Sequence, residues 1–309
     1  MFVARGIEML RVRLVLCSLF AFAVAVCADE PYPRDLVDFK PYVENPVFKG
    51  AGPGHWDEKI RERGWILHEG GEYRLWFTGY VNKIGSIRQL GYATSKDGIH
   101  WTRFDKNPLQ AKHWIEDVMI VRDGDTLFMF AEGLNDESQL LSSKNGLQWT
   151  HLGKMDVRLA NGEPISPGPY GTPTAWKEND VWYFFYERRD LGIWVATSKD
   201  MKVWTNLSDE PVIKPGPEEY DARAVAMNQI IKLDGKYYAS YHGHAKEGVG
   251  RWVSCLASSP DLRTWTKYSK NPLFPPEQNK SSAIFVPDGK KYRLYTMHDR
   301  VELHVPTEE

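Results

Sequence analysis

The chain has 309 residues, of which 42% are hydrophobic and 26% charged, so it is long enough to bury a large core. Its formal net charge of −2 excludes the strongly basic proteins that bind nucleic acids or anionic membranes through their charge, and we expect no nucleic-acid partner. Aromatic residues make up 13% of the chain, which favours β-sheet.

The N-terminus has the pattern of a signal peptide. Arg11 and Arg13 precede the apolar run 14–26, and small residues follow at the end of that run. The run is shorter than a membrane-spanning helix requires. The sequence therefore predicts a signal peptide over residues 1–28, cleavage after Ala28, and a secreted or periplasmic protein that has no membrane partner after cleavage.

A nine-residue pattern recurs four times and predicts a β-hairpin each time. Every copy has Asp or Asn at its turn and ends in Trp-Thr. The spacing of the copies, about 50 to 60 residues, is in the range of β-propeller blades. The copies are residues 94–102, 142–150, 197–205 and 258–266.

In chain order, each hairpin follows a proline-containing linker and two further predicted strands. The linkers contain Pro46, Pro108, Pro164, Pro211 and Pro272. The strand pairs are predicted at 65–68 with 73–78, 118–121 with 126–131, 173–176 with 181–186, 229–233 with 237–241, and 283–286 with 292–297.

The hairpin has no fifth copy, so the last blade needs an outer strand from elsewhere. We expect residues 36–42 to supply it, which closes the ring with both chain ends and removes a bare sheet edge. The sequence therefore predicts an all-β fold, a single five-bladed β-propeller domain over residues 29–309 that is closed by an N-terminal strand.

Propeller geometry predicts which residues converge. Adjacent strands run antiparallel, so the start of the first strand and the end of the second lie on one face, around the central channel. We expect the strand starts to bring Asp57, Glu116, Asp117, Tyr170, Asp221 and Arg223 to this face, and the strand ends to bring Glu132, Glu187, Arg188, His242 and His298.

Structural roles compete with functional ones at several of these positions. Asp57 lies in a charged run that extends to Arg63, and such a run is typical of a solvated surface. A cap or turn explains Asp221 equally well. An unpaired carboxylate at the start of an inner strand is costly, which favours function for Glu116 and Asp117.

Carboxylates at the mouth of a channel suit glycoside hydrolysis. That reaction needs a protonated acid for the leaving oxygen and an ionised carboxylate to activate water or attack carbon. A third carboxylate nearby raises the pKa of the acid by like-charge repulsion.

The hairpins at residues 95–102 and 259–266 resemble those of the five-bladed β-propeller glycosidases, which include glycoside hydrolase families 43, 32, 68, 117 and 130. The resemblance covers nearly the whole mature chain. It implies an Asp base or nucleophile in the first blade, and an Asp and a Glu acid on later blades. None of the carboxylates here lies in the local motifs of those families. By resemblance, Asp57 or Glu58 corresponds to the first of these carboxylates, Asp117 or Glu116 to the second, and Glu187 to the third.

We therefore expect a secreted glycoside hydrolase that cleaves polysaccharide or oligosaccharide fragments, with inversion as the resemblance implies. The expected general acid is Glu187 and the expected base is Asp57 or Asp117, with Glu116 or Asp221 as modulator or substrate ligand. The residues expected to bind the sugar are Glu132, Tyr170, Arg188, Arg223, His242 and His298.

Two alternatives remain open. A glycoside phosphorylase would use Arg188, Arg223 and the histidines to bind phosphate opposite a single acid. A non-catalytic carbohydrate-binding propeller would keep the aromatic residues without needing the carboxylates. The sequence contains no motif for a cofactor or a metal; the resemblance alone allows a structural Ca²⁺ or a water cluster in the channel near His298. The oligomeric state is left open.

Overall fold

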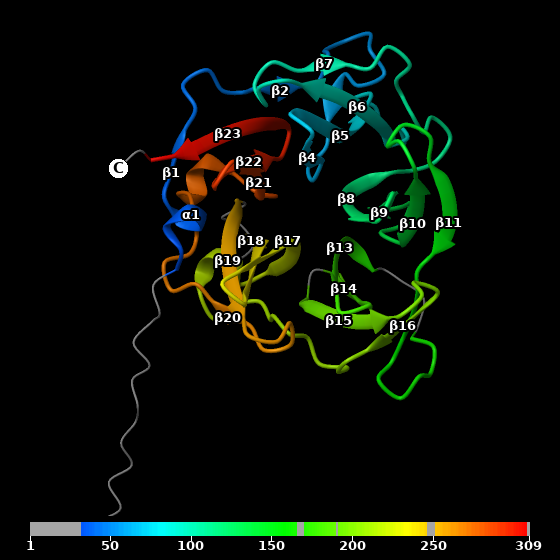
Figure 1. The fold of residues 1–309 in the computed structure, drawn as a ribbon, viewed down its shortest axis with the longest axis vertical. Helices are drawn as coiled ribbons and strands as arrows, with labels where there is room; N and C mark the ends of the chain where they lie inside the picture. Colours follow the sequence, from blue (N-terminus) through cyan, green and yellow to red (C-terminus); the bar gives the residue numbers. More distant parts are fainter. Residues whose placement is uncertain (1–31, 166–169, 190, 246–250, 308–309) are drawn as a thin grey trace, which may run out of the picture. The chain divides into compact units, whose positions relative to one another are not determined.

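The structure is a computed structural model that describes residues 32–165, 170–189, 191–245 and 251–307 (Figure 1). The predicted signal peptide, residues 1–28, lies outside the described residues. Within the described residues, no helix is long and apolar enough to cross a membrane.

Five β-sheets surround a central axis and form the blades of a β-propeller (Figure 1), which confirms the predicted fold. Blade 1 consists of β4 (Trp65–Glu69), β5 (Glu72–Tyr80), β6 (Gln89–Ser95) and β7 (Thr102–Arg103), with the two-residue strand β3 (Lys59–Ile60) paired to the end of β5. Blade 2 consists of β8 (Glu116–Asp123), β9 (Thr126–Glu132), β10 (Ser138–Ser143) and β11 (Thr150–Lys154). Blade 3 consists of β13 (Gly171–Glu178), β14 (Val181–Glu187), β15 (Ile193–Ser198) and β16 (Val203–Asn206), with β12 (Asp156–Arg158) outermost. Blade 4 consists of β17 (Ala224–Leu233), β18 (Lys236–His244), β19 (Trp252–Ser259) and β20 (Thr266–Lys267). Blade 5 consists of β21 (Ile284–Asp288), β22 (Lys291–Met297) and β23 (Arg300–Pro306).

An N-terminal strand closes the ring, as predicted. Strand β1 (Phe39–Pro41) pairs antiparallel with β23, and β2 (Phe48–Lys49) pairs with the start of β23. The strand is shorter than the expected 36–42 because the chain first forms the one-turn helix α1 (Arg34–Val37), which buries Leu36 completely. The last blade therefore contains both ends of the described propeller.

The repeated linker has a physical function in the fold. The side-chain amide of Asn107 accepts a hydrogen bond from the backbone N–H of Tyr92 (2.9 Å) and donates to its carbonyl (2.8 Å), so it satisfies both polar groups of one residue of β6. Asn45 forms the same pair of bonds with Leu303 in the third strand of blade 5, and Asn271 forms it with Leu256 in the third strand of blade 4. These amides attach the linkers to the sheets.

The repeated hairpin turns share one hydrogen-bond pattern. In blade 1, Ser95 Oγ accepts from the backbone of Gly98, and Asp97 Oδ1 accepts from the next two N–H groups, at 2.9 and 2.8 Å. Asn145, Asp200 and Asp261 make corresponding bonds in blades 2, 3 and 4. This is the local reason for the conserved spacing between Ser and Asp within the chain's own repeats.

Candidate active site

The predicted convergence of strand ends occurs on one face of blades 2 and 3. Glu116 at the start of β8 is the cross-strand partner of Glu132 at the end of β9. Gly171 at the start of β13 is the partner of Glu187 at the end of β14. All three glutamates are buried. We call this part of the channel mouth the carboxylate rim.

The inner strands are irregular where they reach the mouth, and this irregularity positions the polar side chains. Pairing shifts register between Glu116 and Met119 and between Gly171 and Thr174. At these shifts Asp117 and Thr172 have left-handed backbones, with φ of 51° and 47°. Such conformations are uncommon for residues with a Cβ, and β-bulges of this kind re-aim side chains near active sites.

Thr172 connects two of the carboxylates on the rim. Its backbone N–H donates to Glu132 Oε2 (2.9 Å), and its hydroxyl lies 3.5 Å from Asp117 Oδ2. The residue before it must be glycine, because a Cβ on Gly171 would lie within 3 Å of both Glu187 Oε1 and Glu132 Oε2. Glu132 and Glu187 therefore face each other across Gly171.

Burial changes the acidity of this cluster. It raises the pKa of Asp117 and of Glu132 well above their ordinary values, and the negative charges of Asp117 and Glu116 raise the pKa of Glu132 further. Burial also raises the pKa of Glu116, although Arg61 and Arg88 oppose this shift. Because these carboxylates repel one another, a proton held on one of them favours ionisation of its neighbours, and a site that holds both forms suits acid–base catalysis.

Three arginines lie among the carboxylates. Arg88 Nε is 3.3 Å from Glu116, and its guanidinium stacks on the ring of Tyr80 at 4.0 Å. Arg61 lies 3.9 Å from Glu116 Oε1. Arg63 is completely buried and donates to the carbonyl of Pro173 (2.7 Å), so it joins blade 1 to blade 3 across the channel.

A second polar group lies at blades 4 and 5. His298 Nδ1 lies 3.3 Å from Glu62 Oε2 and 3.1 Å from Ser281 Oγ. Burial opposes ionisation of Glu62, but the hydrogen bond to His298 and the charge of Arg61 lower the pKa of Glu62 to about 2. His242 is buried against Asn228 (3.1 Å), and burial lowers the pKa of His242 to about 4.

Asp57 and Asp221 occupy a different environment. Asp57 forms an ion pair with Arg103 on β7 (2.8 Å), and Asp221 forms one with Lys267 on β20 (2.6 Å). The hydroxyl of Tyr241 also donates to Asp221 (3.0 Å). Both aspartates are buried, and in both pairs the cation lies 46 positions further along the chain. They are equivalent residues of blades 1 and 4 that tie the mouth loop to the outer strand.

The expected sugar-binding residues are not equally placed. Tyr170 precedes the rim glycine and lies under the guanidinium of Arg188, at 5.7 Å from its ring centre. Arg223 is exposed just before β17, where its backbone N–H donates to the carbonyl of His244. The structure thus brings Tyr170 and Arg188 next to the carboxylate rim.

Sequence reasoning missed the arginines and Glu62. The run Arg61-Glu62-Arg63 has the composition of an exposed surface, yet Glu62 and Arg63 reach the channel. A signal was available: Arg63 lies two residues before the inner strand of blade 1, and it shares the left-handed backbone (φ 54°) that Asp117 and Thr172 have at the starts of the inner strands of the next two blades. Arg88 lies outside the repeated positions of the blades, so comparing the repeats could not identify it.

The neighbours of His298 do not fit a Ca²⁺ site. Ca²⁺ takes six to eight oxygen ligands, whereas the groups bonded to His298 are one carboxylate and one hydroxyl. Among the described residues, no three His, Cys, Asp or Glu side chains gather as a metal-ligand set.

Known proteins share this architecture, although no family model matches the sequence. The chain is 24% identical to a 1,2-β-oligomannan phosphorylase from Thermoanaerobacter sp. over 270 residues, which span 82% of this chain and 88% of that protein. A glycosyl hydrolase from Bacteroides ovatus matches in structure with a TM-score of 0.72 and 18% identity, over 90% of this chain and 97% of that one.

A third similar protein has been solved with a sugar bound. The complex of β-1,2-mannobiose phosphorylase from Listeria innocua with β-1,2-mannobiose matches with a TM-score of 0.69 and 18% identity, over 87% of this chain and 96% of that one. The chain therefore has the five-bladed propeller fold of glycoside hydrolase-like proteins, as the hairpin resemblance predicted.

Proposed function

We propose that this chain is a glycoside hydrolase that cleaves oligosaccharides at the carboxylate rim. The observation that carries the proposal is the pair Glu132 and Glu187, which face each other across Gly171 with Asp117 linked through Thr172. Two carboxylates this close repel when both are ionised, which favours the state in which the pair shares one proton. A protonated acid beside a further carboxylate meets the requirement for glycoside hydrolysis.

In this proposal the residues of the rim have separate roles. Glu187 protonates the leaving oxygen as the bond from the anomeric carbon to that oxygen breaks. While the pair of Glu132 and Glu187 holds the proton, Asp117 is the carboxylate that is ionised, and it takes a proton from the water that attacks the anomeric carbon. Glu132 keeps the proton on the pair by repulsion, and Thr172 holds Glu132 and Asp117 in register. Tyr170 and Arg188 lie where they can contact the sugar.

The partners of the arginines support water rather than phosphate as the nucleophile. Arg61 and Arg88 face Glu116, and Arg63 donates to the carbonyl of Pro173 and to the hydroxyl of Thr174. A phosphate would have to displace Glu116 from Arg61 and Arg88 before these two side chains could bind it.

Phosphorolysis is the second candidate, because two similar curated proteins are named as β-1,2-mannan-type phosphorylases. Arg61 has a side chain that is 42% exposed at the mouth and could turn to a phosphate. The predicted export of the chain supports hydrolysis instead, since phosphorolysis conserves its products as sugar phosphates for use inside the cell.

The test is a turnover assay on the purified protein. Its substrates are β-1,2-mannobiose, β-1,2-mannotriose and a panel of aryl glycosides, each with and without inorganic phosphate. We expect phosphate-independent release of free sugar. Glu187→Gln should lower the rate about 10²–10⁴-fold, as loss of a general acid does, and should spare aryl glycosides whose leaving group needs no proton. Glu210→Gln, at a surface glutamate that is 79% exposed, is the matched control.

Three results would contradict the proposal in different ways. A sugar phosphate formed only with phosphate present would assign phosphorolysis. Full activity of Glu187→Gln on natural linkages would remove that residue from catalysis. Binding of oligosaccharide without any turnover would assign a carbohydrate-binding propeller.

A further inference from the structure

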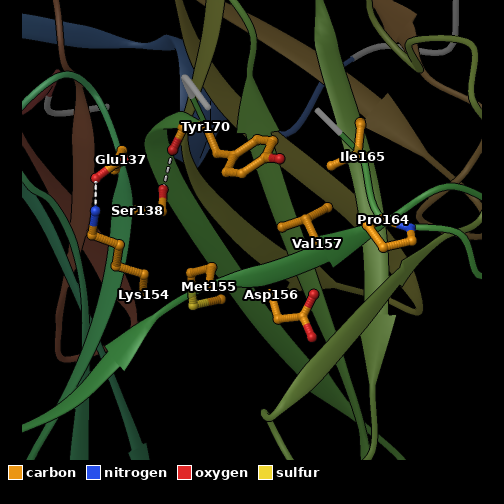
Figure 2. Close-up of a pocket in the computed structure, with 9 residues that line it drawn as sticks. All are labelled: Glu137, Ser138, Lys154, Met155, Asp156, Val157, Pro164, Ile165 and Tyr170. Carbon is orange, nitrogen blue, oxygen red and sulfur yellow. Dashed lines mark hydrogen bonds and ion pairs between the residues drawn. The ribbon is translucent and has the colours of Figure 1, made fainter. Parts of the chain in front are cut away.

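A cavity of about 220 Å³ opens between blades 2 and 3 beside the carboxylate rim (Figure 2). Its buried wall is formed by Met155, Val157 and Tyr170, and the exposed side chains of Lys154 and Asp156 lie at its edge. Tyr170 directly precedes the glycine that separates the two catalytic glutamates. The cavity and the proposed active site therefore share a wall.

A second cavity, of about 380 Å³, adjoins the first along the same seam. Lys154 and Met155 line both cavities. Leu140, Leu152 and Met201 give the second cavity an apolar lining, and Leu152 is 52% exposed. We call the two cavities together the seam groove. It runs between blade 2 and blade 3 from Tyr170, on the side of the channel mouth, to Met201 in the turn between β15 and β16.

The chemistry of the seam groove fits a neutral chain of hydroxyl-bearing rings. Its apolar and aromatic walls offer flat surfaces against which the C–H faces of a sugar can pack. The charged side chains of the first cavity are already paired, Lys154 with Glu137 and Asp156 with Arg158 (2.8 Å), and the second cavity adds one acid and one base, Asp200 and Lys202, so the groove offers donors and acceptors with little net charge. The first cavity is smaller than the 300 Å³ or more that encloses a drug-sized ligand, and its size suits a single sugar ring.

We propose that the seam groove binds the sugar units of an oligosaccharide that lie beyond the cleaved bond, with the first unit against Tyr170 and Val157 and later units over Leu152. This inference rests on the proposed glycoside hydrolase function. It makes the preferred substrate a neutral oligosaccharide longer than a disaccharide.

The test compares substrate length with groove variants. The probes are β-1,2-mannobiose, -mannotriose and -mannotetraose, and the quantity measured is kcat/KM. We expect kcat/KM of the wild type to rise with length. Lys154→Ala and Leu152→Ala should lower it about tenfold for the tetraose and less than about twofold for the biose, which corresponds to about 1.4 kcal/mol of binding free energy lost only by the longer substrate.

The matched control is Lys144→Ala. Lys144 lies in the turn after β10, at the opposite end of the β10–β11 hairpin from Lys154, and pairs with Asp125 on the surface (2.7 Å). We expect no effect of this variant at any length. Equal losses of kcat/KM at all substrate lengths, or a kcat/KM of the wild type that does not depend on length, would contradict sugar binding in the seam groove.

A separate binding measurement keeps the two proposals distinguishable. If the wild type cleaves nothing, titration calorimetry with the tetraose and the biose is made on wild type and Lys154→Ala. Tighter binding of the tetraose that Lys154→Ala abolishes would uphold the groove while the hydrolase proposal fails. Equal affinity of both proteins for both sugars would reject the groove as well.

Discussion

Several residues that give this protein its proposed chemistry also lower the stability of the fold. Asp117 and Thr172 are held in left-handed backbone conformations, each of which costs about 1–3 kcal/mol. Asp117 and Glu132 are buried close enough for the charge of one to raise the pKa of the other. Burial of this kind is unfavourable to the fold and useful to catalysis, since it raises the pKa of a group that must donate a proton.

Glu132→Gln is therefore expected to stabilise the protein while it impairs turnover. The pKa of Glu132 is raised in the folded state, so as the pH rises above the ordinary value near 4.3 the unfolded chain loses this proton first and the folded state loses stability. A neutral Gln removes this penalty. We expect a melting temperature about 2–4 °C higher at pH 7 for a gain of about 1 kcal/mol, and no difference near pH 4. A lower melting temperature at pH 7 would mean that weakening the hydrogen bond from Thr172 costs more stability than removing the buried carboxyl group gains.

His242 predicts a second pH dependence, in the opposite direction. Its folded pKa of about 4 lies below the unfolded value near 6.5, so its contribution to stability is complete above pH 6.5 and is lost as the pH falls towards 4. The size of this loss is about 3 kcal/mol. In urea unfolding at pH 7 and pH 4.5, His242→Gln should lose less stability on acidification than the wild type, whereas His55→Gln, at an exposed histidine, should behave as the wild type.

At the scale of elements, equivalent ion pairs in blades 1 and 4 give two of the predicted catalytic carboxylates a structural partner. Asp57 with Arg103, and Asp221 with Lys267, each connect the segment before the inner strand to the outermost strand of the same blade. Asp221 is completely buried, so its charge depends on this partner. Each pair holds the segment before the inner strand against the outermost strand of its blade.

Asp221→Asn is expected to destabilise the fold and leave the chemistry intact. Removing one member of a buried ion pair costs about 3–5 kcal/mol, because the other charge is left without compensation. We expect a clear loss in urea stability, partly restored by adding Lys267→Met, and a kcat of the folded protein within about twofold of wild type. A kcat lowered a hundredfold in a protein that remains folded would return Asp221 to the catalytic set.

The repeats made the fold predictable, and they made the site only partly so. Hairpins and linkers recur with local signals, so blade number and strand pairs could be derived from Trp-Thr and Asn-Pro spacing alone. The same logic placed Glu116, Glu132 and Glu187 on one face. It could not tell Asp117 from Asp57, because the difference is an ion pair formed across 46 residues. Arg103 and Lys267 both follow a Trp-Thr, and comparing these positions would have revealed the pairing.

At the scale of the molecule, one short strand holds the ring together. Blade 5 takes its outer strand from β1, which is only three residues long, and β2 adds two more. Without β1, the edge of β23 would present unpaired backbone groups of the kind that promote association with other chains. Separation of β1 from β23 is therefore the expected first step in unfolding of the propeller.

A disulfide across this closure tests that expectation. Lys40 and Val305 are cross-strand partners of β1 and β23, and neighbouring Cα atoms in such a pair are about 4.5–5.5 Å apart, within the range a disulfide needs. Lys40→Cys with Val305→Cys would close nearly the whole propeller into one covalent ring, for which chain entropy sets an upper limit of about 5 kcal/mol. Cys255 is buried and should not compete. We expect the oxidised protein to melt several degrees above its own reduced form, and the reduced form to melt with the wild type. If oxidation leaves the melting temperature unchanged, the ring opens first at another blade, and the seam between blades 2 and 3 becomes the place to look because two adjoining cavities already lie along it.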